Sequence, residues 1–251
     1  MGTNIVFANQ KGGVGKTTSA VNLGAYLAEA GKKILLIDFD PQANLSSSLG
    51  YRSQDKNIYS VMTKNVDPES AIQKTSVDNL YVIPSSIDLT GANVELIEES
   101  DREFFLKNVL LKIEDSWDYI FVDCPPSLGL LTINGLTAAD KVIIPMQCEY
   151  FALEGLSLLL QTIKRVQHSL NPELKIGGIV FTMFDSRTRL ANEVVHEVTS
   201  YFKESVFRTI IPRNVRLSEA PSHSVPINQY EPDCVGAKSY EKFAQEVLER
   251  V

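Results

Sequence analysis

The feature that most constrains this chain is a glycine-rich loop between a short apolar run and a helical pattern. The apolar run covers residues 5–8, the loop covers residues 9–18, and the helical pattern covers residues 16–30. Glycines let backbone N–H groups turn toward an anion, and the first turn of a helix adds a partial positive charge. Strand, loop and helix in this order predict a phosphate-binding site rather than a glycine-rich turn with a chance Gly-Lys-Thr.

The loop departs from the standard phosphate loop at two positions. A strict pattern has glycine where this chain has Gln10, and this chain carries an additional lysine, Lys11. Lys16 is placed to reach β- and γ-phosphates, and the Thr17 hydroxyl is placed to bind Mg²⁺. We therefore expect the nucleotide phosphates to be held by Lys11, Gly12, Gly13, Val14, Gly15, Lys16, Thr17 and Thr18.

Short apolar runs without polar alternation recur along the chain and predict buried strands. They lie at residues 33–38, 80–83, 119–123, 142–144 and 176–181. Between and after them, helical spacing predicts helices at residues 92–113, 153–168, 189–202 and 238–251, whereas residues 212–232 look mostly like loop. Strands covered on both faces lack alternation. The predicted fold is α/β, a doubly wound, mostly parallel sheet with helices on both faces and ligands at the strands' carboxyl ends.

Length and composition favour one domain over residues 1–251, since there are 251 residues, 44% of them hydrophobic, and no linker or repeat. The net charge of −7 argues against a protein that coats nucleic acid. Residues 187–251 are balanced, with 9 basic and 9 acidic side chains, so a polyanion-binding face is expected there. Sparse cysteines without a C-x-x-C motif suit a reducing compartment. We expect neither a signal peptide nor a membrane span.

Carboxylates follow two of the predicted strands. Asp123 ends the run 119–122 in the manner of a Walker B acid, so we expect it near Mg²⁺, through water. Asp38 and Asp40 follow the run 33–37. Asp38 is a candidate for hydrated Mg²⁺ or for a structural cap, and Asp40 lies where a carboxylate could orient the attacking water.

Four segments together resemble the ParA/Soj chromosome- and plasmid-partitioning ATPases, a deviant Walker A group that also includes MinD and the nitrogenase iron protein. The segments cover residues 11–18, 38–44, 121–129 and 212–222, in the family's order. The last one resembles the chromosomal, Soj-like branch. The resemblance therefore identifies a deviant P-loop NTPase with ATP and Mg²⁺ as cofactors.

The resemblance also implies roles for residues. Lys16 and Thr17 would bind phosphate and Mg²⁺, Lys11 would cross to the partner's nucleotide in an ATP-sandwich homodimer, and Asp40 would support hydrolysis. Adenine would lie near Met183, Pro212, Arg213 and Asn214. ATP-bound dimers of the family bind double-stranded DNA without sequence preference, and a ParB/Spo0J partner triggers their otherwise slow hydrolysis. The implied location is cytoplasmic and nucleoid-associated.

Basic side chains near the carboxyl terminus are candidates for DNA contact. They are Arg187, Arg189, Arg216, Lys238 and Lys242, and the resemblance favours the regions of Arg189 and Arg216. Each of them is about as well explained as a solvated surface charge.

Two other functions found in this group of ATPases, membrane binding and metal-cluster binding, fit the sequence less well. A MinD-like membrane helix would need a basic face, but the last helical pattern mixes glutamate with lysine, and its apolar side is better explained by core packing. A cluster role for Cys124 or Cys148 is disfavoured, and Cys124 is expected to be a small buried residue. The open alternatives are a positioning ATPase for the septum or another cargo, and a DNA-bound regulator of replication or transcription.

Overall fold

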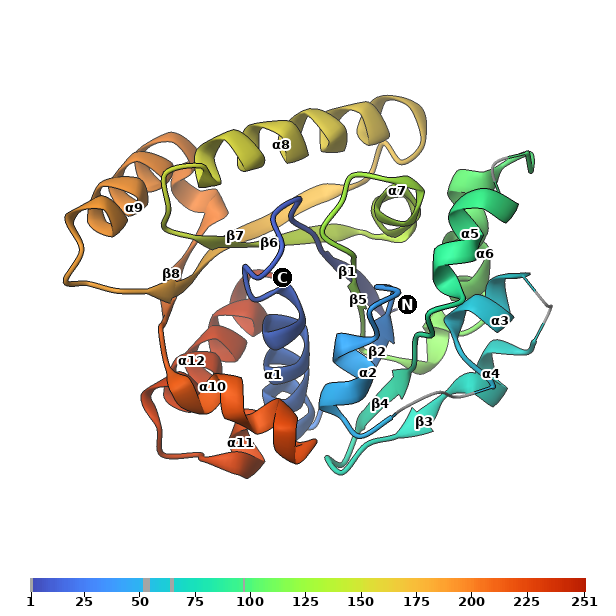
Figure 1. Cartoon of the computed structure of the whole chain (residues 1–251), viewed down its shortest axis with the longest axis horizontal. Helices are drawn as coiled ribbons and strands as arrows, with labels where there is room; N and C mark the ends of the chain where they lie inside the picture. Colours follow the sequence, from blue (N-terminus) through green and yellow to red (C-terminus); the bar gives the residue numbers. More distant parts are fainter. Residues whose placement is uncertain (1, 52–54, 64–65, 97) are drawn as a thin grey trace.

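The computed structural model describes residues 2–51, 55–63, 66–96 and 98–251, and an eight-stranded sheet forms its centre (Figure 1). The strand order is β3-β4-β2-β5-β1-β6-β7-β8; β3 pairs antiparallel with β4, and the other pairs are parallel. The strands are β1 (Thr3–Phe7), β2 (Ile34–Asp38), β3 (Gln73–Lys74), β4 (Leu80–Ile83), β5 (Tyr119–Asp123), β6 (Lys141–Gln147), β7 (Lys175–Phe184) and β8 (Val206–Pro212). The predicted doubly wound α/β fold is confirmed.

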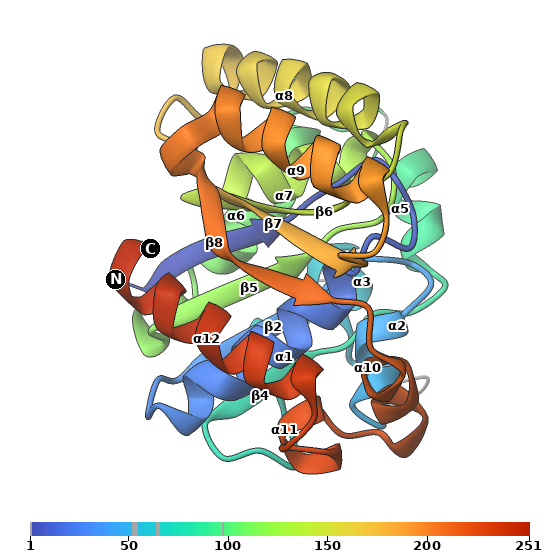
Figure 2. The same ribbon diagram turned by 90° about the vertical axis from the view of Figure 1, so that its left-hand side faces the viewer.

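Helices cover both faces of the sheet, which lies between them in Figure 2. Side chains from α1 (Lys16–Glu29), α2 (Asn44–Ser48), α10 (Val215–Glu219), α11 (Ile227–Tyr230) and α12 (Val235–Arg250) enter the core on one face. The core on the opposite face takes side chains from α3 (Ile58–Thr63), α4 (Pro68–Ala71), α5 (Leu89–Glu95), α6 (Phe105–Leu110), α7 (Leu130–Ala138), α8 (Ala152–Ser169) and α9 (Arg189–Phe202).

The central strands supply side chains to these two cores in alternation. In β1, Ile5 and Phe7 enter the core beneath α1 and α12, whereas Val6 enters the core beneath α7 and α8. Phe121 in β5 packs edge to face on Phe7, with ring centroids 5.3 Å apart. Because both faces are buried, the strands show no polar alternation, which is the reason the apolar runs predicted them correctly.

Several parts of the chain differ from the sequence-based expectation, which did not include β3, α2, α3, α4 or α7. The helix predicted at 92–113 is divided into α5, a 3-10 helix at Arg102–Phe104 and α6, with Asp101 in a left-handed conformation (φ 59°) between them; residue 97 lies outside the described residues. The edge strand β8 was missed because Arg208 and Thr209 interrupt its apolar pattern. The segment 212–232, expected to be mostly loop, forms α10, a 3-10 helix at Ala220–His223 and α11.

The last helix is part of the core. Tyr240, Phe243 and Val247 of α12 are almost fully buried, and Phe207 of β8 meets Phe243 edge to face at 4.9 Å. This arrangement confirms the expectation that the apolar side of this helix packs inside the protein. Among the described helices, none has the length and apolar character needed to cross a membrane.

Glu246 ties α12 to the edge strand. Its carboxylate accepts hydrogen bonds from Arg208 N (2.8 Å), from Thr209 N (2.9 Å) and Oγ1 (2.8 Å), and from Arg250 Nη1 (2.8 Å). Burial acts to raise the pKa of Glu246, but these donors outweigh it and hold that pKa below its usual value. The ionised carboxylate therefore stabilises the fold.

We predict that Glu246→Ala lowers the free energy of unfolding by about 2 kcal/mol at pH 7, because it leaves two backbone N–H groups without their acceptor. The folded-state pKa is depressed, so this contribution is present above the unfolded pKa and is lost as pH falls through the folded pKa. Urea unfolding at pH 7 and pH 4 measures the difference between the variant and the parent. Glu249→Ala, at an exposed position of the same helix, is the control. An equal effect of the two substitutions at pH 7 would contradict the prediction.

Candidate functional site

The glycine loop after β1 has the backbone that a phosphate site requires. Gly13 and Gly15 have φ of 71° and 83°, in the left-handed region that favours glycine, and Gly15 is the N-cap of α1. Neighbouring strands hold the loop in place: Thr182 Oγ1 donates to Val14 O (2.8 Å), and Gln147 Nε2 donates to Gly13 O (3.0 Å). The loop is thus fixed at the carboxyl edge of the sheet.

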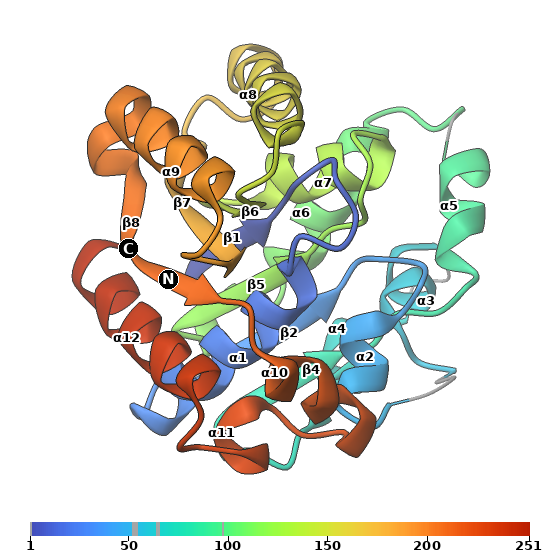
Figure 3. The same cartoon turned by 60° about the vertical axis from the view of Figure 1, so that its left-hand side comes forward.

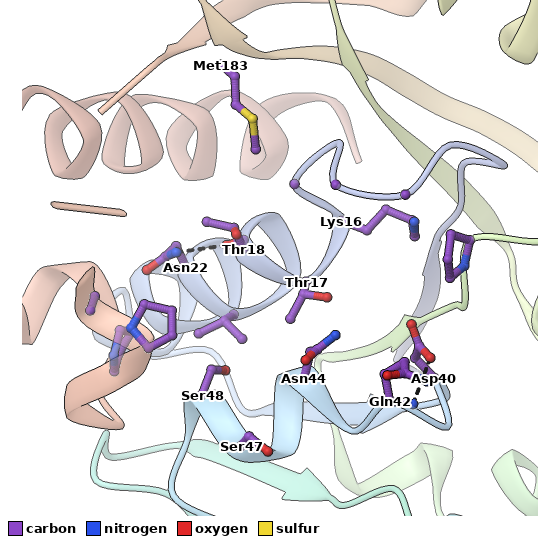
Figure 4. A pocket seen from close by; sticks show the side chains of 18 of the residues that line it. Lys16, Thr17, Thr18, Asn22, Asp40, Gln42, Asn44, Ser47, Ser48 and Met183 are labelled. Atoms are coloured by element: carbon purple, nitrogen blue, oxygen red, sulfur yellow. Dashed lines mark hydrogen bonds between the residues drawn. The ribbon is translucent and has the colours of Figure 1, made fainter. Parts of the chain in front are cut away.

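A cavity of about 460 Å³ opens beside this loop (Figure 4). The start of α1 and the segment between β2 and α2 form much of its wall, and Figure 4 shows Lys16 and Asp40 at one end. Of the predicted phosphate-binding residues, Gly12, Gly13, Gly15, Lys16, Thr17 and Thr18 line the cavity. The cavity is also lined by residues for which the sequence predicted no role: Val21, Asn22, Gln42, Asn44, Ser47, Ser48, Pro126, Ala220, Pro221, Val225 and Pro226.

A second cavity of about 190 Å³ adjoins the first. The two cavities share Gly15, Thr18, Met183 and Pro221 in their walls. The second one is also lined by Pro212, Arg213 and Asn214, the residues that the sequence predicted for adenine. Met183 stands at the junction with φ 50°, a conformation that is strained for a residue with a side chain. The structure thus brings the predicted base-binding residues next to the phosphate loop.

Asp123 lies under the loop and fits a hydrated Mg²⁺. It is 1% exposed; Oδ2 accepts a hydrogen bond from Thr17 Oγ1 (2.6 Å), whereas Oδ1 has no partner among the described residues. Burial, with the neighbouring Asp38 as the next cause, raises the pKa of Asp123 to about 8, although Thr17 and the Lys16 ammonium act to lower it. A cation would relieve this burial of charge, and the free oxygen is a suitable acceptor for metal-bound water.

Asp38 does not line the cavity, and its contacts are those of the structural cap, the alternative to hydrated Mg²⁺ that the sequence left open for it. It is fully buried beside Asp123 in the parallel register of β2 and β5. Its Oδ2 accepts hydrogen bonds from Ser46 N (2.7 Å) and Ser46 Oγ (2.6 Å), and Oδ1 accepts one from Asp40 N (3.3 Å). With both oxygens occupied by protein donors, Asp38 organises the β2–α2 segment instead.

Asp40 does reach the cavity. It is 7% exposed, and its Oδ1 accepts a hydrogen bond from Gln42 N (2.9 Å), which fixes the carboxylate in a turn. This position agrees with the role predicted for it.

The two lysines of the loop are placed differently. Lys16 is 6% exposed and lines the cavity; its closest described partner is Lys11 O, at 3.4 Å from Nζ. Burial lowers the pKa of Lys16, while Asp123, Cys124 and Asp40 act to raise it. The Lys11 side chain is 38% exposed and forms an ion pair with Glu149, which follows β6. Lys16 therefore lines the cavity, whereas Lys11 does not line it and is held by Glu149 at a partly exposed position.

The candidate DNA-binding side chains lie on the surface in three helices, α9, α10 and α12. Arg189 pairs with Glu193 (2.6 Å), Arg216 with Glu219 (2.8 Å) and Lys238 with Asp233 (3.7 Å). Lys242 is exposed, and Arg187, the further candidate, pairs with Asp185 (2.6 Å). Among the described residues, each of these cations except Lys242 is thus paired with an acidic side chain.

The cysteines considered for a metal cluster lie in the hydrophobic core. Cys124 is fully buried and Cys148 nearly so, as expected for small core residues. Among the described residues, no group of three or more His, Cys, Asp and Glu side chains could hold a metal ion. A Mg²⁺ site here would therefore depend on Thr17, water and phosphate oxygens rather than on a protein cage.

A family model described as an AAA domain matches residues 2–176. The chain is 61% identical over 250 residues to the chromosome-partitioning ATPase Soj of Treponema pallidum, covering 100% of this chain and 98% of that one. The chain belongs to the Soj/ParA family of chromosome-partitioning ATPases. The predicted family is confirmed, and with it the assignment as an ATPase.

Solved structures similar to this Soj/ParA chain contain nucleotides. A putative plasmid partition protein of Borrelia burgdorferi bound to AMPPNP has a TM-score of 0.83 and 31% identity, covering 100% of this chain and 99% of that chain. A Mycobacterium smegmatis protein described as cobyrinic acid a,c-diamide synthase, with a bound ATP analogue and magnesium, has a TM-score of 0.86 and 37% identity, covering 99% and 95%. The expected cofactors, ATP and Mg²⁺, are those of these neighbours.

We predict that Asp123→Asn weakens Mg²⁺-dependent nucleotide binding about 10- to 100-fold, as is typical when an outer partner of a metal is removed. Without Mg²⁺ the variant should be at least as stable as the parent, because it no longer buries a carboxylate beside Asp38. Calorimetric titration of ATP with and without Mg²⁺ measures the first effect, and thermal unfolding measures the second.

Asp38→Asn is the matched control, and we expect it to keep the Mg²⁺ dependence of nucleotide binding. Loss of that dependence in Asp38→Asn but not in Asp123→Asn would show that the roles of the two carboxylates are reversed.

Proposed function

We propose that this chain is a DNA-segregation ATPase whose ATP-bound homodimer binds double-stranded DNA without sequence preference. Hydrolysis, stimulated by a ParB/Spo0J-type partner and slow without it, releases the dimer from DNA. The whole of residues 1–251 acts as one such domain, in the cytoplasm and on the nucleoid. The single observation that best supports this proposal is the different placement of the two lysines of one loop: Lys16 lines the cavity, whereas Lys11 lies in a partly exposed ion pair with Glu149.

Within one subunit, the chain's residues hold the nucleotide. Lys16 and the loop N–H groups from Gly12 to Thr18 would hold the phosphates, and Thr17 would bind Mg²⁺. Asp123, which accepts a hydrogen bond from Thr17, would also accept one from metal-bound water. Met183 and the Pro212–Asn214 segment, which line the second cavity, would hold the adenine. When bound, ATP and Mg²⁺ supply the cleavable phosphate and the charge that offsets Asp123.

Lys11 completes the site of the other subunit. An exposed ammonium beside the loop can reach a second copy that closes over the nucleotide, where it neutralises charge on the transferred phosphate. Phosphate in the partner's site competes with Glu149 for this ammonium. ATP binding and dimerisation then favour each other, because each supplies an interaction that the other needs.

Asp40 supports hydrolysis from the cavity wall. Phosphoryl transfer depends mainly on positioning and charge stabilisation, so a fixed carboxylate that orients the attacking water is sufficient. A slow basal rate fits a site that is complete only when a second subunit and a partner protein are present.

DNA binding by the dimer rests on Arg189, Arg216, Lys238 and Lys242. Scattered lysine and arginine contacts to phosphate give affinity that is independent of sequence and falls with salt. A single subunit with net charge −7 and dispersed cations binds weakly, whereas two linked subunits double the contacts. This explains why DNA binding would require the ATP-bound dimer.

The membrane alternative has less support, because the apolar face of α12 is already used in the core. Two alternatives would use the same nucleotide site with a different partner. One is a positioning ATPase for another cargo, and the other is a DNA-bound regulator of replication or transcription.

We expect Lys16→Ala to lose nucleotide binding, since it removes the ammonium that lines the cavity. Lys11→Ala should bind ATP within about threefold of the parent but fail to form a stable dimer. Light scattering with ATP and Mg²⁺ measures the dimer, and fluorescent-ATP titration measures binding. A Lys11→Ala protein that dimerises like the parent would refute the role in the partner's site.

The proposed ATP-dependent DNA binding is tested by measuring how the protein binds DNA and anionic liposomes with ATP, with ADP and without nucleotide. We expect binding to DNA only with ATP and Mg²⁺, with affinity falling as salt rises. Asp40→Ala should bind ATP and remain on DNA, whereas the parent dissociates as it hydrolyses. Lipid binding without DNA binding would overturn the proposal, and parental hydrolysis by Asp40→Ala would remove Asp40 from the mechanism.

A further inference from the structure

Arg216 differs from the other candidate DNA contacts because a second residue, Tyr230, also donates to the carboxylate that it pairs with. Arg216 Nη1 donates to Glu219 Oε2 at 2.8 Å, and the Tyr230 hydroxyl donates to the same oxygen at 3.1 Å. The Tyr230 ring stacks on His223, with centroids 4.8 Å apart and planes at 28°. The carboxylate is therefore positioned by α10 and α11 together.

The backbone around Glu219 is also fixed. Ala220 and Pro221, the next two residues, line the nucleotide cavity on the inner side of the segment. Leu217 packs so closely on Gly236 that an added Cβ would lie 2.8 Å from it, and Ile227 N donates to Asn22 Oδ1 of α1 at 2.7 Å. Figure 3 shows α10 and α11 beside α1 and α12. The segment thus has a cavity-facing side and an outer side that carries Arg216 and Glu219.

The comparable pair on α9 lacks this support. Arg189 is 92% exposed and pairs with Glu193 across one helical turn, and Glu193 accepts no other hydrogen bond from the described residues. Such exposed pairs lose side-chain entropy when they form and contribute little. Pairing of Arg216 with Glu219 costs less side-chain entropy, because the hydrogen bond from Tyr230 already restricts the Glu219 side chain.

We propose that Glu219, held by Tyr230, is a built-in competitor for DNA phosphate at Arg216, an inference that rests on the proposed DNA binding. A carboxylate and a phosphate offer a guanidinium the same kind of oxygen acceptor. A DNA phosphate must therefore displace Glu219 to use Arg216 fully. The contact lowers the affinity of each subunit for DNA and reduces the counterion release that Arg216 would otherwise contribute.

The test measures DNA affinity as a function of salt for the ATP-bound protein, carrying Asp40→Ala to prevent turnover. Glu219→Gln should bind about two- to fivefold more tightly per subunit, with a steeper salt dependence. Tyr230→Phe removes the second donor without changing charge and keeps the ring on His223. We expect it to strengthen binding by a smaller factor. Arg216→Ala should abolish the effect of both substitutions.

Glu241→Gln is the control for charge alone, since Glu241 is exposed on α12 and forms no ion pair with a described residue. If Glu219→Gln and Glu241→Gln change affinity equally, or if Glu219→Gln acts equally with and without Arg216, the competitor role is wrong while the proposed function stands. If no ATP-bound variant binds DNA, both are overturned. Unchanged ATP binding by each variant verifies that the cavity wall is intact.

Discussion

Two carboxylates, Asp38 and Asp123, end neighbouring parallel strands side by side in the interior, and the arrangement of the site depends on how their charge is compensated. Burial raises the pKa of Asp38 to about 6 and of Asp123 to about 8. Hydrogen bonds from Ser46 and the Asp40 N–H occupy Asp38 within the protein. Asp123 keeps one oxygen, beneath the loop, that has no hydrogen-bond partner in the described part of the chain. The fold therefore places a carboxylate oxygen that can bind a cation or its water below a loop whose N–H groups can bind an anion. A metal–nucleotide complex has the matching charges.

The parts of this site that depend on short, continuous segments could be predicted from the amino-acid sequence. The loop 11–18 sits between a strand and a helix, so its position at the carboxyl edge follows from chain connectivity. Asp123 ends an apolar run, and the parallel arrangement of such runs places it at the same edge. For Met183 and the segment 212–214 the resemblance supplied the prediction, and the structure gathers these residues around a second cavity.

The parts that depend on side-chain pairing across the fold could not be predicted. Asp38 and Asp123 look alike in sequence, since each ends an apolar run. What separates them is Ser46, whose hydroxyl and N–H both reach Asp38 eight residues away. The segment after β8 looked like loop because its helices are only four or five residues long and depend on packing against α1 and α12 rather than on helical periodicity. Glu149 gave no signal beyond its place just past a predicted strand.

The pairing of Lys11 with Glu149 bears on how strongly a second copy would bind. If Lys11 were unpaired in the free chain, its transfer to a partner's phosphate would contribute the full charge-assisted interaction. Because its charge is already compensated, closure of the proposed dimer would exchange one ion pair for another, and only the difference would favour the dimer. Phosphate carries more negative charge than a carboxylate, so that difference favours the dimer while the γ-phosphate is present and shrinks when it is lost. The Lys11–Glu149 pair is partly exposed, so breaking it costs little. Loss of the γ-phosphate is therefore what would make the proposed dimer reversible on hydrolysis.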